Sequence, residues 1–98
     1  MASSQDYLDY VLDLLREVNN ITYKRMMGEY ILYSNGILFG GIYDNRFLVK
    51  DTKSISNIGM QKEKPYDGAK DMLLVDSEDA LVIKDIVLKV VYDLNKGK

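Results

Sequence analysis

Side chains suited to binding chemistry are concentrated between residues 21 and 50, a stretch with a net charge of +2. Cations that alternate with aromatic rings are typical of surfaces for single-stranded nucleic acid, because phosphates pair with the cations and bases stack on the rings. The alternative is that the rings lie in the core or in a protein interface, and that the cations reach water from the rim of a sheet. The net charge of −2 for the whole chain favours this alternative. The cations are Lys24, Arg25, Arg46 and Lys50, and the rings are Tyr30, Tyr33, Tyr43 and Phe47.

The chain contains neither cysteine nor histidine. These absences exclude disulfides, thiolate nucleophiles, the commonest metal ligands and the Ser-His and Cys-His catalytic pairs. They also remove the usual general base near neutral pH. We therefore expect no catalytic activity, no metal and no cofactor. The alternative is a small enzyme or ligand-binding domain that uses Asp, Glu, Lys or Tyr, although no constellation of these residues stands out.

The stretch Arg25-Met26-Met27-Gly28-Glu29 allows two interpretations. Arg25 and Glu29 have opposite charges and could form a functional ion pair. Equally, Gly28 could be a turn residue, with the two methionines filling irregular space in the core. The residue types favour the structural interpretation, and Met27 and Glu29 are kept as candidate interaction residues.

Length and composition predict a single folded domain over residues 1–98. Hydrophobic residues make up 47% and charged residues 29% of the chain, which is ordinary for a globular protein with one modest core. The first ten residues show no basic start followed by an apolar run, and no apolar stretch is long enough to span a membrane. We therefore expect a cytoplasmic protein.

The first half of the chain predicts one helix followed by antiparallel strands. Residues 4–18 repeat apolar side chains at three- and four-residue spacing, with acidic residues between them, as an amphipathic helix does. The strands that follow are separated only by "SNG" and "DN", and such short separators are typical of tight hairpins. The predicted strands are 28–33, 37–43 and 46–50, and residues 21–27 form either another short strand or a connecting turn.

The second half predicts a weaker helix from residue 51 or 52 to Gly59 and then a polar loop with a turn at Pro65–Gly68. A short strand is expected at 71–75. A final helix is expected at 77–95, where Asp76-Ser77 supplies a cap. The predicted fold class is α+β, with an N-terminal helix, an antiparallel β-meander of three or more strands, a short helix, a further strand and a C-terminal helix.

Both faces of the predicted meander are apolar. Ile31 and Tyr33 alternate with Leu32, and the other strands also place large apolar residues at both parities. A half-exposed sheet would alternate apolar with polar residues, so we expect this sheet to be covered on both sides, by helices or by a second subunit. Gly40-Gly41 within a strand is interpreted as a bulge.

Five short groups of residues in the centre of the chain match a known family in order and spacing, namely Arg25 to Tyr30, Leu32-Tyr33, Asn35-Gly36, Phe39-Gly40 and Asp44 to Lys50. With them, the chain resembles the N-terminal domain of the TfoX/Sxy competence regulators of bacteria over nearly its whole length. It departs from many members by having Met27-Gly28-Glu29 instead of Met-Phe-Gly-Gly.

The resemblance implies an α+β fold with a curved antiparallel sheet, in a stand-alone domain without the helical C-terminal domain of the full-length regulators. It implies no catalytic residues. We therefore expect a non-catalytic interaction or regulatory module that acts through contacts with a protein partner or within a homodimer, in transcription or competence regulation. The alternative is a nucleic-acid-associated regulator that binds through Lys24, Arg25, Arg46 and Lys50.

Overall fold

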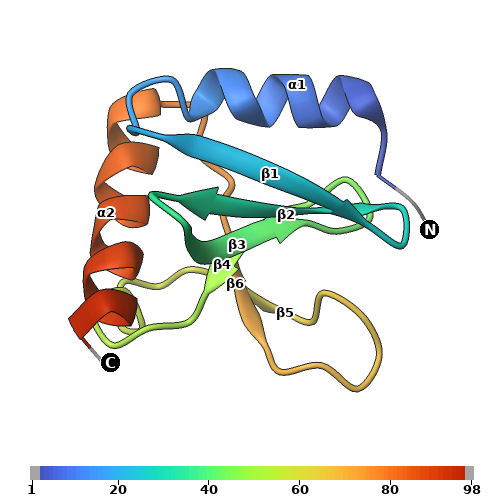
Figure 1. Ribbon diagram of the computed structural model, residues 1–98. Coiled ribbons are helices and arrows are strands. Elements are labelled where there is room, and N and C mark those ends of the chain that lie inside the picture. Colours follow the sequence, from blue (N-terminus) through green and yellow to red (C-terminus); the bar gives the residue numbers. More distant parts are fainter. Residues whose placement is uncertain (1–2, 97–98) are drawn as a thin grey trace.

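Six antiparallel strands form one sheet in the order β1-β2-β3-β4-β6-β5, with two helices packed against it (Figure 1). The structure is a computed structural model that describes residues 3–96. It confirms the predicted α+β class. No helix within the described residues is long and apolar enough to cross a membrane. The elements are α1 (Gln5–Leu14), β1 (Ile21–Met26), β2 (Glu29–Ser34), β3 (Ile37–Ile42), β4 (Phe47–Lys50), β5 (Lys62–Glu63), β6 (Met72–Leu74) and α2 (Ala80–Lys96).

Strands β1 to β4 form a meander joined by three two-residue turns. Residues 21–26 are therefore a strand, which was one of the two predictions for them. The predicted turns at Asn35-Gly36 and Asp44-Asn45 are confirmed, and all four residues have positive φ angles, between 51° and 79°. Such angles suit tight hairpins because they match the twist of the flanking strands.

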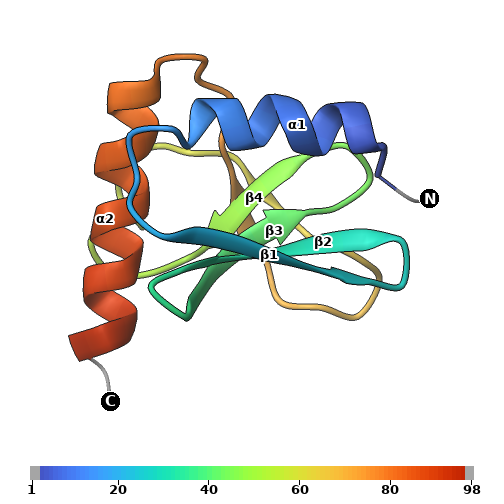
Figure 2. The same ribbon diagram turned by 45° about the horizontal axis from the view of Figure 1, so that its top comes forward.

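Both helices cover the same face of the sheet, which we call the helix face (Figure 2). Leu8 and Val11 of α1, and Ile83 and Val87 of α2, are fully buried. They belong to one cluster with side chains of the sheet, and burying this apolar area is the main source of folding free energy. The sheet residues of this cluster include Leu32, Phe39, Ile42, Phe47, Val49 and Leu73.

The opposite face, which we call the open face, has no helix over it. Ile31, Tyr43 and Leu48 form a second, smaller buried cluster there. Helices therefore cover one of the two faces that the sequence predicts to be covered. The chain covers part of the open face with its own loop, residues 64–71, because Pro65 and Tyr66 of that loop reach across to Arg46 and Tyr43.

A bulge next to Gly40-Gly41 confirms the interpretation of these glycines. Leu32 pairs with Gly40 and Tyr33 with Leu38, so Phe39 is an extra residue on β3. A Cβ atom at position 40 would lie 2.3 Å from the carbonyl oxygen of Leu48. Such a contact is far inside van der Waals distance, so only glycine allows β3 and β4 to approach this closely.

The weak helix expected between residue 51 and Gly59 does not form. The segment makes isolated turns, with Ile55 N–H bonded to the Thr52 carbonyl. Asp93 of α2 accepts hydrogen bonds from the backbone N–H and the hydroxyl of Ser54 at 2.8 and 2.7 Å. This contact ties the segment to α2, and the β-branched residues of the segment oppose helix formation weakly.

Phe39 and Tyr33 provide a test of the two faces. Phe39 is fully buried on the helix face, so Phe39→Ala should lower the free energy of unfolding by about 3–5 kcal/mol. Tyr33 on the open face is only partly buried, so Tyr33→Ala should cost about half as much or less. Urea denaturation of both variants measures the difference, and equal losses would contradict the assignment of faces.

The Asp93 contact predicts a dependence of stability on pH. The hydrogen bonds from Ser54 lower the pKa of Asp93 below its ordinary value of 3.8. A lowered pKa in the folded state adds stability above pH 3.8, and this contribution is lost as the pH falls through the folded-state pKa. Asp93→Asn should therefore be less stable than the parent at pH 7, and the difference should shrink at about pH 3.

Urea unfolding at both pH values tests this, with Asp67→Asn in an exposed loop as the control. A deficit of the Asp93→Asn variant that is equally large at both pH values would contradict the prediction.

Candidate functional site

The floor of the open face is apolar. Leu48 is fully buried and Ile31 is 8% exposed, although no helix lies above them. The pairing register shows which other residues lie on this face, because directly paired residues of antiparallel strands point to the same side of the sheet. Four further side chains that surround the floor are only partly buried, namely Tyr33, Leu38, Met72 and Leu74.

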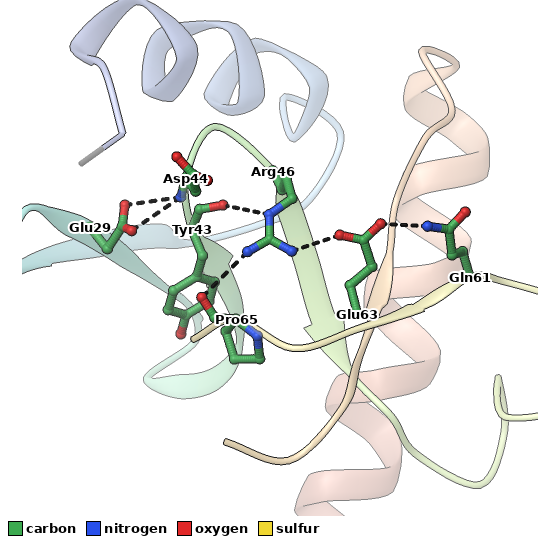
Figure 3. Close-up of polar contacts among 7 residues, drawn as sticks. All are labelled: Glu29, Tyr43, Asp44, Arg46, Gln61, Glu63 and Pro65. Atoms are coloured by element: carbon green, nitrogen blue, oxygen red, sulfur yellow. Dashed lines mark hydrogen bonds and ion pairs between the residues drawn. The ribbon is translucent and has the colours of Figure 1, made fainter. Parts of the chain in front are cut away.

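Arg46 holds the chain segment that crosses toward this face (Figure 3). Its Nε donates to the Tyr43 carbonyl at 3.1 Å, Nη1 to Glu63 Oε1 at 2.6 Å and Nη2 to the Pro65 carbonyl at 3.4 Å. The guanidinium thus joins the turn before β4 to β5 and to the start of the loop. Its planar set of donors suits three such contacts at once, which a lysine could not reproduce.

A cleft of about 470 Å³ lies between the open face and residues 64–71. Tyr43 and Tyr66 lie side by side at its wall, with ring centroids 6.4 Å apart. Burial, and then the neighbouring Tyr66, raise the pKa of Tyr43 above its ordinary value of 10.0, so its hydroxyl is neutral at physiological pH. Leu38 and Met72 add apolar lining, which gives an amphipathic cleft.

Two lysines line the cleft and a third lies on the same face of β1. Lys50 and Lys70 line the cleft itself, together with Asp51 and Asp71. Lys24 pairs with Ile31 in the register, which places it on the open face. Within residues 3–96, none of the three forms an ion pair, whereas Lys62 and Lys64 pair with Asp51 and Asp71.

Glu29 has a structural role at the end of the sheet. Its carboxylate accepts hydrogen bonds from the backbone N–H and hydroxyl of Ser3 at 3.0 and 2.6 Å, and from the N–H of Asp44 at 3.1 Å. These bonds tie the start of α1 to two turns of the meander, as Figure 3 shows for Asp44. The less favoured interpretation, an ion pair between Glu29 and Arg25, is absent from the described ion pairs.

The remaining candidate residues are divided between the two faces. Arg25 pairs with Tyr30 in the register, and both lie on the helix face, with the guanidinium carbon 5.9 Å from the ring centre. Phe47 is buried beneath the helices. Met27 lies at the tip of the β1–β2 turn and is 96% exposed, so it does not fill the core.

The open face therefore brings together Lys24, Tyr33, Tyr43 and Lys50, with Arg46 holding the loop beside it, and leaves out Arg25 and Tyr30. The sequence prediction missed Tyr66, Lys70 and Met72, which come from the second half of the chain. Two signals point to them, namely the "PYDGAK" turn and the short apolar run of β6. No group of three acidic side chains that could hold a metal ion occurs among the residues that the structure describes.

No protein-family profile matches this chain. A relative is found in Spirochaeta aurantia, described as an uncharacterized 12.7 kDa protein in the trpE 5' region. The two sequences are 33% identical over 91 residues, which cover 89% of this chain and 79% of the relative. At this identity and coverage the two proteins share one fold and one origin, and the chain belongs to the family of this spirochaete protein.

Proposed function

We propose that this chain is a non-catalytic interaction module that binds a partner protein through its open face. The observation that carries the proposal is the position of the second apolar cluster. Ile31, Tyr43 and Leu48 lie on a face without a helix, and a single loop shields only part of it. The apolar side chains around this cluster are only partly buried, and accessible apolar area beside a cleft is a common feature of binding surfaces on small domains.

The charge of this surface indicates the chemistry of the partner. Lys50 and Lys70 at the cleft, and Lys24 across the sheet, have no carboxylate partner among the described residues. Complementary charge speeds encounter and favours the correct partner over others. The partner is therefore a protein segment with apolar side chains for the cleft and acidic side chains for the lysines.

Binding of nucleic acid is the weaker alternative. Arg25 lies on the helix face, and the charge of Arg46 is balanced by Glu63. Lys24 and Lys50 are left, but they lie on β1 and β4, three strand spacings or about 14 Å apart. With Lys70 at the cleft they make three separate lysines, which form a weak phosphate-binding surface. The regulatory role that a resemblance to the TfoX/Sxy N-terminal domain implies is part of this proposal, and we infer that it is exerted through proteins.

Arg46→Ala tests whether the loop is held as described. Loss of three hydrogen bonds and a partly buried ion pair should lower the free energy of unfolding by about 2 kcal/mol. Arg16→Ala is the matched control, because the Arg16–Asp13 pair is exposed and should contribute less than about 0.5 kcal/mol. Amide hydrogen exchange should increase selectively in residues 61–71 of Arg46→Ala, and an unchanged loop would contradict the clamp.

Binding through the open face is tested with two tyrosines of similar exposure. Tyr66 at the cleft is 65% exposed, and Tyr92 on α2 is 62% exposed. Tagged parent, Tyr66→Glu and Tyr92→Glu proteins would be cross-linked in cells of the source organism, and captured proteins would be quantified by mass spectrometry.

We expect at least one protein to be recovered with the parent and with Tyr92→Glu, and to be reduced at least tenfold with Tyr66→Glu. Equal recovery with all three baits, or recovery of no protein above background, would contradict the proposal. Short DNA and RNA probes in a fluorescence anisotropy titration at low salt test the alternative.

A further inference from the structure

The β1–β2 turn contains a residue that its backbone conformation does not favour. All six central residues of the three hairpin turns of the meander have positive φ angles, and five of them are Asn, Asp or Gly. The sixth is Met27, at φ +52°. A methionine side chain does not stabilise this backbone conformation, which Asn and Gly adopt more readily. Met27 therefore costs folding stability at a position where asparagine would fit.

Contacts within the chain do not compensate for this cost. Met27 is 96% exposed, and its neighbour Met26 is 49% exposed. The base of the turn is nevertheless held firmly, since the Gly28 carbonyl accepts a hydrogen bond from Ser3 N–H at 3.1 Å and Glu29 is anchored on Ser3 and Asp44. The tip is thus a preorganised apolar projection, and unfavourable backbone conformations that persist are often found at binding sites.

A cleft on the same chain has matching properties. It has a volume of about 430 Å³ and lies between α1 and the segments around β4 and β6. Tyr7, Tyr10 and Phe47 supply apolar walls, and the ring centroids of the two tyrosines are 5.7 Å apart. This volume falls in the range of about 300–1,000 Å³ that is usual for ligand pockets, so the cleft can accept a long, flexible side chain such as methionine.

The charges of the tip and of the cleft are opposite. Arg25 precedes the tip on the helix face and forms no ion pair within residues 3–96. Asp76 and Glu78 lie at the rim of the cleft, where Glu78 accepts a hydrogen bond from the Tyr10 hydroxyl at 3.1 Å. Arg46 also lines the cleft, but Glu63 balances its charge.

We propose that the Met26-Met27 tip of one copy of this chain binds in the α1–β4 cleft of a second copy, with Arg25 facing Asp76 and Glu78. The contact uses a different surface from the open face, so it goes beyond the proposed function. A hairpin tip in a cleft buries less than the roughly 1,200 Å² of a standard interface, which predicts a weak dimer with a micromolar dissociation constant.

Sedimentation equilibrium of the purified chain from about 5 to 500 µM tests the proposal. The weight-average mass should rise from 11.2 kDa toward twice that value, and high salt should reduce the rise. Met27→Asn should raise the thermal midpoint, because asparagine suits the turn, and should weaken the dimer at least tenfold. A monomeric parent at 500 µM, or a Met27→Asn variant that dimerises like the parent, would overturn the proposal.

A charge exchange distinguishes the proposed contact from any other dimer. Arg25→Glu and Glu78→Lys should each be monomeric, because each places like charges together at the tip and the cleft. An equimolar mixture should restore dimers at least tenfold over either variant alone, since every tip then meets a cleft of opposite charge. Leu88→Glu on the exposed side of α2 is the control and should dimerise normally.

A mixture that stays monomeric while the parent dimerises would contradict the assigned contact. None of these measurements involves the variants of the open face, so failure of this proposal would leave the proposed partner binding to be decided by its own test.

Discussion

A sheet that is apolar on both faces needs cover on both, and this chain has helices for only one. Leu8, Val11, Ile83 and Val87 of the helices are fully buried against the helix face. The other face carries Ile31, Tyr43 and Leu48 and is shielded only in part by residues 64–71. Burial of apolar area is the main favourable term in both folding and association, so the partly covered face favours a further contact.

Two polar side chains hold the connecting segments in place around the sheet. Arg46 fastens residues 63–65 beside the sheet, and Glu29 ties the start of α1 to two turns of the meander. Neither side chain is left free for a ligand. Both were candidate interaction residues in the sequence, and the structure explains why charged residues occur there. The segments that they hold are too short to form an α-helix with a buried apolar face. Hydrogen bonds to these two side chains hold them in place instead.

The sequence predicted the fold class, both long helices and the hairpin turns, because these depend on local periodicity and on residues that accept positive φ. It could not predict β5, whose residues Lys62 and Glu63 show no apolar alternation and are strand only because they pair with β6. The helix expected to reach Val18 ends at Leu14, and α2 begins at Ala80, where Asp79 caps Leu81 N–H. Lys24 and Arg25 lie on opposite faces because side chains alternate along a strand. Which of the two faces the helices cover depends on tertiary packing, so the sequence could not predict it.

The central claim is that the open face is occupied by a protein in the cell. Hydroxyl-radical footprinting tests it most directly, because Tyr66 at the cleft and Tyr92 on α2 are 65% and 62% exposed and have the same intrinsic reactivity. Oxidation would be compared between the purified protein and the same protein in living cells. The account predicts that Tyr66 is protected in cells relative to Tyr92, by at least severalfold. Equal oxidation of the two tyrosines in both settings would contradict it.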